Sequence, residues 1–241
     1  MKSIPESILS DLKKASNKEK ADFLPKFFKA GPGEYGEGDK FLGVTVPIQR
    51  QIAKQYYKEI NLKNLETLIT SPFHEVRLTT LFILVFKFTS KQTNESEQKE
   101  IVDFYLRHTK SINNWDLVDS SAEKILGAYY FERSRKILHQ FQKSKDLWEN
   151  RIAILSTFYF IRKGDFEDTL LYCISYLSHE HDLIHKATGW MLREIGNRDP
   201  KTLKSFLNSH VSKMPRTMLR YAIEKLPEPE RKFWLSQDSN V

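Results

Sequence analysis

The fold is decided by a stretch that recurs along the chain, Leu147-Trp148-Glu149-Asn150-Arg151-Ile152-Ala153-Ile154-Leu155, in which one basic residue interrupts an apolar pattern. Its Asn150-Arg151-Ile152 lines up with Val76-Arg77-Leu78, His185-Lys186-Ala187 and Leu219-Arg220-Tyr221. The basic residues are separated by 74, 35 and 34 residues, and 74 is close to twice the shorter spacings. Repeats built from helix pairs have periods of roughly 33–47 residues, so this spacing predicts stacked helix pairs.

Apolar residues recur with helical periodicity along almost the whole chain, and no segment has the alternation typical of a strand. The fold class that we predict is all-α, an α-solenoid of HEAT-like helix pairs with a concave basic face. We expect a single repeat domain over residues 1–241. The expected helices cover residues 4–15, 18–30, 47–59, 62–70, 73–90, 95–109, 114–130, 132–143, 147–162, 166–178, 182–196, 200–210, 215–225 and 228–236.

The composition describes a globular protein, with 40% hydrophobic and 29% charged residues in a chain of 241. The single cysteine, Cys173, excludes an internal disulfide and a multi-cysteine metal site. The start of the chain has no secretory signal pattern, and the longest apolar run, Leu78 to Phe88, is too short to span a bilayer. We therefore expect a cytoplasmic protein without a membrane partner. Its net charge of +7 fits nucleic-acid binding without establishing it.

One repeat lacks the basic residue and has Asn114-Trp115-Asp116-Leu117-Val118-Asp119 instead. Trp115 and Asp119 are four residues apart and share one face of a helix. An acid beside an indole on an exposed face is a candidate site for chemistry on a cation. The alternative is purely structural: Asn114 caps the helix, Asp116 faces the helix dipole and Trp115 belongs to the core.

The register assigns further residues to the same surface. It makes Trp115 equivalent to Arg151 and Lys186, and Asp119 equivalent to Leu155 and Trp190. Equivalent helices of a solenoid line one concave face. We expect the basic register residues to lie there, together with two nearby arginines from the last quarter of the chain. They are Arg77, Arg151, Lys186 and Arg220, with Arg193 and Arg216. The alternative is that a repeated basic residue only bridges neighbouring repeats.

Two other motifs carry no function in our interpretation. Gly31-Pro32-Gly33-Glu34-Tyr35-Gly36 matches G-x-G-x-x-G, but a helical segment precedes it and nearby acids would repel a pyrophosphate. His181 and His185 are four residues apart, with His179 nearby, as in a two-ligand metal face. No further ligand has a suitable spacing, so we expect neither a metal nor another cofactor.

Three blocks of sequence together resemble the HEAT-like-repeat DNA alkylation repair glycosylases. They are Trp115-Asp116-Leu117-Val118-Asp119, the stretch from Leu147 to Leu155, and Lys186-Ala187-Thr188-Gly189-Trp190-Met191-Leu192-Arg193-Glu194. The blocks have the order and spacing of that family, and the resemblance extends from about Leu24 to Leu235.

The resemblance implies a solenoid that binds duplex DNA and hydrolyses the N-glycosidic bond of N3- or N7-alkylated purines. It implies that Asp119 is the catalytic carboxylate, that Trp115 and Trp190 flank the deoxyribose of the lesion, and that Arg151 contacts the DNA backbone. It also implies that the damaged base stays stacked, whereas most glycosylases flip the base into a pocket. The expected partner is double-stranded DNA with alkylated bases, and the expected state is a monomer.

The residues are consistent with this chemistry. An alkylated purine already carries a positive charge and leaves without a general acid, so charge develops on the sugar. A fixed carboxylate stabilises such charge and orients water, and indole faces attract cationic groups.

Two features depart from the family pattern: the loop from Gly31 to Asp39 is longer and more acidic, and Phe27 or Phe28 stands where the family has Tyr. Both bear on the range of lesions and on the rate.

Two other functions compete with the glycosylase. The first is a non-catalytic binder of structured or branched nucleic acid on the same scaffold, which would not need Asp119, Trp115 and Trp190. The second is a protein-interaction solenoid, which predicts apolar or mixed residues where this chain repeats Arg and Lys.

Overall fold

The computed structural model describes residues 2–237 and confirms the all-α fold. No strand is present among these residues, and Lys40 and Phe73 form an isolated parallel bridge. The chain divides into two compact units between Tyr129 and Tyr130, and each unit is described by itself below. The single repeat domain over residues 1–241 stays a prediction.

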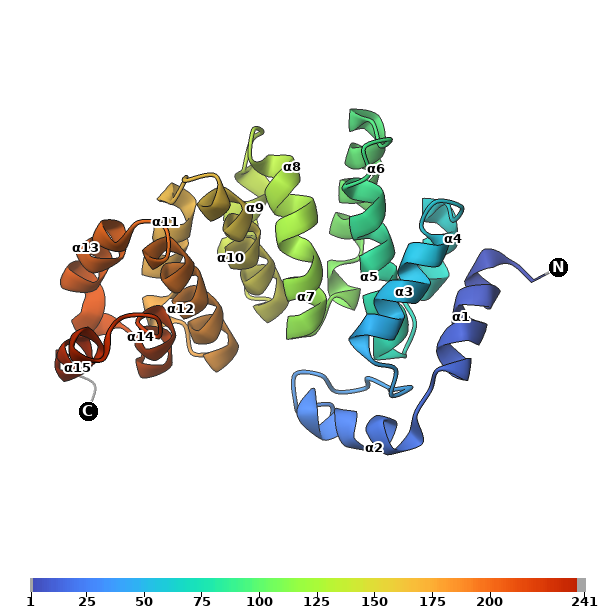
Figure 1. The fold of residues 1–241 in the computed structure, drawn as a ribbon, viewed down its shortest axis with the longest axis horizontal. Helices are drawn as coiled ribbons and strands as arrows, with labels where there is room; N and C mark the ends of the chain where they lie inside the picture. Colours follow the sequence, from blue (N-terminus) through green and yellow to red (C-terminus); the bar gives the residue numbers. More distant parts are fainter. Residues whose placement is uncertain (1, 238–241) are drawn as a thin grey trace. The chain divides into compact units, whose positions relative to one another are not determined.

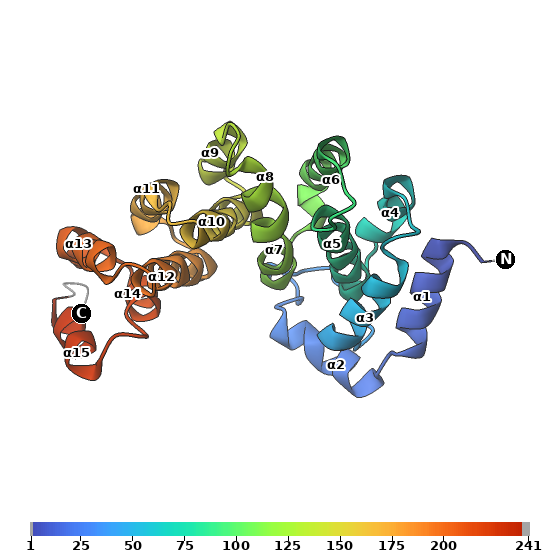
Figure 2. The same cartoon turned by 45° about the horizontal axis from the view of Figure 1, so that its top comes forward.

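The first unit is built around α5, which is buried on nearly every side. In Figures 1 and 2, α3 and α7 lie on either side of α5, and α4 and α6 lie behind them. The run from Leu78 to Phe88 supplies the apolar side chains that fill the centre of the unit. The helices are α1 (Ile4–Lys14), α2 (Lys18–Phe27), α3 (Val46–Tyr56), α4 (Leu62–Ile69), α5 (His74–Phe88), α6 (Glu95–Arg107) and α7 (Trp115–Ala122).

The second unit has the paired arrangement that the repeat predicts. Figure 2 shows α10, α12 and α14 side by side in one row, with α9, α11 and α13 in another. Gly189 permits close packing of α12 on α14, since a Cβ there would lie 2.5 Å from the Met218 carbonyl oxygen. The helices are α9 (Lys136–Gln142), α10 (Leu147–Arg162), α11 (Glu167–Ser175), α12 (Asp182–Gly196), α13 (Pro200–His210), α14 (Arg216–Ala222) and α15 (Glu228–Ser236).

The helix boundaries follow local capping chemistry. Ser3 and Asn94 form capping boxes with the glutamates three residues later. Asp146 and Asp199 accept hydrogen bonds from free backbone N–H groups at the starts of α10 and α13. α2 ends at Phe27, earlier than expected, and Lys29 in the next turn adopts a left-handed φ of 54°.

The helix expected over 114–130 is interrupted. After α7, residues Glu123–Gly127 form a π-helical turn, which is followed by the short α8 (Ala128–Tyr130). The position where α7 begins also corrects the register. Asp119 is the fifth residue of α7, as Arg151 is of α10 and Lys186 is of α12, so Asp119 and not Trp115 matches these basic positions.

Every helix among residues 2–237 is too short or too polar to cross a membrane.

Candidate functional site

α7 begins at Trp115 because Asn114 caps it, which confirms the predicted cap. The buried Asn114 side chain accepts a hydrogen bond from the Trp115 backbone N–H at 2.9 Å and donates one to the Phe28 carbonyl oxygen at 3.3 Å. Gly36 permits this approach, since a Cβ there would lie 2.5 Å from the Phe28 oxygen. The start of α7 is therefore tied to the residue that follows α2.

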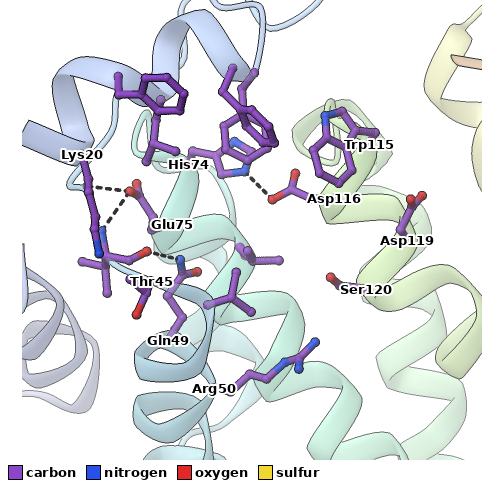
Figure 3. Close-up of a pocket in the computed structure, with 18 of the residues that line it drawn as sticks. Lys20, Thr45, Gln49, Arg50, His74, Glu75, Trp115, Asp116, Asp119 and Ser120 are labelled. Carbon is purple, nitrogen blue, oxygen red and sulfur yellow. Dashed lines mark hydrogen bonds and ion pairs between the residues drawn. The ribbon is translucent and has the colours of Figure 1, made fainter. Parts of the chain in front are cut away.

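A buried cluster of four ionisable side chains supports the first turn of α7. Asp116 Oδ2 lies 2.9 Å from His74 Nε2, and His74 Nδ1 lies 2.9 Å from Asp39 Oδ2. The Arg77 guanidinium donates to both Asp39 oxygens, at 2.7 and 2.8 Å. The cluster joins the loop before α3, the start of α5 and the start of α7, and Figure 3 shows its His74–Asp116 contact.

The geometry holds His74 as a cation. Each ring nitrogen faces a carboxylate oxygen, and a neutral imidazole has only one N–H to donate. Burial disfavours the charged form, but the hydrogen bonds to Asp116 and Asp39 outweigh it and raise the pKa of His74 to about 9. His74 and Arg77 together balance the charges of the two carboxylates.

Aromatic side chains connect this cation to Trp115. The Phe28 ring stacks on His74 with centroids 4.5 Å apart, and on Trp115 with centroids 5.5 Å apart. Phe27 contacts the Trp115 indole edge-on at 5.8 Å. A cation stacked on an aromatic face is stabilised by the ring quadrupole, so the stack helps to fix the indole.

A cavity of about 600 Å³ opens beside this stack, within the first unit. Trp115, Asp116, Asp119 and Ser120 line it from α7, and other walls come from α2, the loop before α3, the start of α3 and the start of α5. Figure 3 shows these side chains with Gln49 and Arg50 of α3. Asp119 is half-buried, so a carboxylate and an indole four residues apart line the same cavity.

Glu75 fixes the loop that forms another wall of the cavity. Its buried carboxylate accepts hydrogen bonds from the backbone N–H groups of Leu42, Gly43 and Val44, at distances between 2.7 and 3.3 Å. Gly43 has a φ of +77°, and a Cβ there would lie 2.0 Å from the Asn17 oxygen, so the position requires glycine.

Trp190 belongs to the second unit, on α12. Its indole N–H donates to Glu194 Oε1 at 3.3 Å, and its ring lies 5.7 Å from that of Phe158. The guanidinium groups of Arg162 and Arg198 lie 4.5 and 5.9 Å from the same Phe158 ring. Trp190 is half-buried, and the Phe158 ring that it contacts also faces two arginines that the repeat register did not identify.

Arg77 and Arg151 are buried, which corrects the prediction that they line an exposed DNA-binding surface. Their exposed fractions are 4% and 5%. Besides Asp39, Arg77 donates to the backbone oxygens of Ser71 and Ser111, and Arg151 donates to that of Leu183 at 2.6 Å. These residues bridge neighbouring segments, as the structural alternative predicted.

The other predicted DNA-binding residues all lie in the second unit and reach its surface to different degrees. Lys186 pairs with Asp182 at 2.8 Å, and Arg193 pairs with Glu224. Arg216 donates to the Leu235 carbonyl oxygen at 3.2 Å, and Arg220 is exposed.

The three histidines around the start of α12 have structural contacts. The His181 side chain accepts a hydrogen bond from the Leu183 backbone N–H and so caps α12, and His185 Nε2 contacts the His179 carbonyl oxygen. Among the described residues, no group of three potential ligands could hold a metal ion.

Sequence reasoning missed His74 and Gln49, and it did not predict the contacts that Asp39 and Phe28 make. The only signal for Asp39 was its place at the end of the acidic loop, and nothing in the sequence indicated which buried cation it would contact.

A profile of the family described as "DNA alkylation repair enzyme" matches residues 8–226. The chain belongs to this family. Among solved structures, the fold resembles a predicted DNA alkylation repair enzyme from Enterococcus faecalis, with a TM-score of 0.68, 18% identity, and coverage of 88% of this chain and 97% of the other.

Two proteins from Streptococcus mutans also have the fold. The protein smu.31 has a TM-score of 0.53 at 18% identity and covers 99% of both chains. AlkD2 has a TM-score of 0.51 at 18% identity, with coverage of 93% of this chain and 98% of the other. Among curated proteins, none matches the chain.

Proposed function

We propose that the protein is a DNA glycosylase that excises N3- and N7-alkylated purines from duplex DNA. The observation that carries the proposal is the pairing of Asp119 and Trp115 in the wall of one cavity, in a chain that belongs to the DNA alkylation repair enzyme family. A repair enzyme for alkylated DNA acts on bases that are cationic, and this cavity combines carboxylates with aromatic rings.

The proposed step is hydrolysis of the bond between C1′ and the purine nitrogen. The bonding electrons leave with the base, whose positive charge they neutralise, and C1′ becomes an oxocarbenium ion. Asp119 stabilises this ion and orients the water that adds to C1′ and then releases a proton. A preorganised charge of this kind acts where charge develops in the transition state.

The two acids of α7 have different surroundings. Asp116 contacts His74 under the first turn, whereas Asp119 is one turn further along the cavity wall. Asp116 therefore contributes to the charge balance of the buried cluster, which supports the assignment of the catalytic role to Asp119. The stack on Phe28 suits Trp115 to hold a sugar in place.

In the second unit, we assign to Trp190 the role of the second indole that flanks the deoxyribose of the lesion. We also assign phosphate contacts to Lys186, Arg193, Arg216 and Arg220, whose side chains are not fully buried. Arg77 and Arg151 act as structural residues.

The test is to incubate purified protein with methylated duplex DNA and to separate the released bases by chromatography. Release of 7-methylguanine or 3-methyladenine above the spontaneous rate supports the proposal. Tight duplex binding without release would instead favour the non-catalytic nucleic-acid binder.

A further inference from the structure

The cavity beside Trp115 has the size and walls of a ligand site. Its volume of about 600 Å³ lies within the range of small-molecule sites, roughly 300–1,000 Å³. Phe23, Phe27 and Val46 line the cavity, although they are 60%, 50% and 40% exposed. Exposed apolar side chains that converge on one hollow indicate a bound partner rather than a solvated surface.

Two buried acceptors in the wall have no donor among the described residues. Gln49 is 2% exposed, and its Nε2 donates to the Val44 carbonyl oxygen at 2.8 Å, which fixes the amide and leaves Oε1 without a partner. Asp116 Oδ1 is likewise buried and unpartnered, while Oδ2 faces His74. Buried acceptors normally have partners, so a ligand that fits here carries hydrogen-bond donors.

The charges around the cavity suit a nucleotide. Exposed Lys20, Arg50 and Lys124 line it and can meet a phosphate, and the carboxylate of Asp119 favours a cationic ring inside. The aromatic rings of Phe27 and Trp115 provide surfaces on which a planar base can stack.

We propose that this cavity binds a purine base, whose amino or ring N–H groups donate to Gln49 Oε1 and Asp116 Oδ1. That the base is an alkylated purine rests on the proposed function. The base reaches the cavity either as a nucleotide rotated out of the duplex or as the free product of excision. The first source contrasts with the stacked base that the family resemblance implies.

The first experiment measures binding of free 3-methyladenine to the full-length protein by isothermal titration calorimetry. Val46→Phe narrows the cavity, and Ile48→Phe is its matched control, because Ile48 is 38% exposed on the same helix but does not line the cavity. We expect Val46→Phe to weaken binding by about tenfold or more and Ile48→Phe to leave it unchanged. No binding to the wild type, or equal binding to both variants, would overturn the proposal.

The second experiment tests the two acceptors on the wild-type protein, which avoids any effect of a variant on folding. Adenine and unsubstituted purine share a ring, and only adenine has the exocyclic amino group. Adenine should bind about five- to tenfold more tightly, since a buried acceptor gains a donor. Equal affinities would refute the role of Gln49 and Asp116.

The third experiment distinguishes the two sources by measuring excision of 7-methylguanine from duplex DNA by the same variants. If Val46→Phe loses both base binding and excision while its duplex affinity is unchanged and Ile48→Phe keeps both, the cavity is occupied during excision, as a rotated nucleotide requires. If it loses base binding alone, the cavity holds the released base. If the wild type binds 3-methyladenine in the cavity but excises nothing, the proposed glycosylase function fails while the base site stands.

Discussion

The charged state of His74 makes the stability of the first unit depend on pH in a predictable way. The pKa of His74 is raised from 6.5 to about 9, because the hydrogen bonds to Asp116 and Asp39 outweigh the penalty of burial. The folded protein therefore binds the proton of His74 more tightly than the unfolded chain does. The difference corresponds to about 3 kcal/mol of unfolding free energy, which is present in full below about pH 6.5 and is lost as pH rises to about 9.

Urea unfolding of the wild type and of His74→Gln, followed by circular dichroism between pH 6 and 10, measures this contribution. The two unfolding free energies should differ most at pH 6 and converge above pH 9, because the neutral amide binds no proton in this range. His210→Gln, in the second unit, controls for the loss of a histidine as such. A constant difference between the wild type and His74→Gln across this range would refute the cationic His74.

Three further predictions concern single residues. Arg77→Ala should lower the unfolding free energy by about 3–5 kcal/mol in urea titrations, because it leaves the buried Asp39 carboxylate without its guanidinium partner; a loss below about 1 kcal/mol would contradict its bridging role. Trp115→Ala and Trp190→Ala should each slow excision less than Asp119→Asn does in single-turnover assays, since they hold the sugar without carrying the compensating charge; a larger loss would reverse the assigned roles. Arg220→Ala should make the log–log salt dependence of duplex affinity shallower by about 0.9, as expected for one lost phosphate contact, and an unchanged slope would remove Arg220 from the interface.

Much of the fold follows from the sequence because helices depend on local signals. Periodicity and capping residues placed most helices within a few residues of their observed bounds, as for Asn114 in α7. The register of the repeat was less predictable. A constant period of about 35 residues placed Trp115 at the register position that Asp119, one turn later in α7, occupies.

The site was predicted only in part because its supports come from distant segments. His74 is 42 residues from Asp116 and 35 from Asp39, and no local pattern joins them. The repeated basic residues posed a different difficulty. An arginine that binds phosphate and one that bridges two helices have the same spacing in sequence, and only the burial of Arg77 and Arg151 distinguishes the two roles.

The most direct test of the glycosylase mechanism is single-turnover release of 7-methylguanine by the wild type and by Asp119→Asn. The substitution removes the charge and nearly keeps the shape, so the unfolding temperature and duplex affinity should stay unchanged while the rate falls by about 10²–10³. Asp22→Asn is the matched control, because Asp22 is an exposed acid on α2 that does not line the cavity. Excision at the wild-type rate by Asp119→Asn would contradict the mechanism.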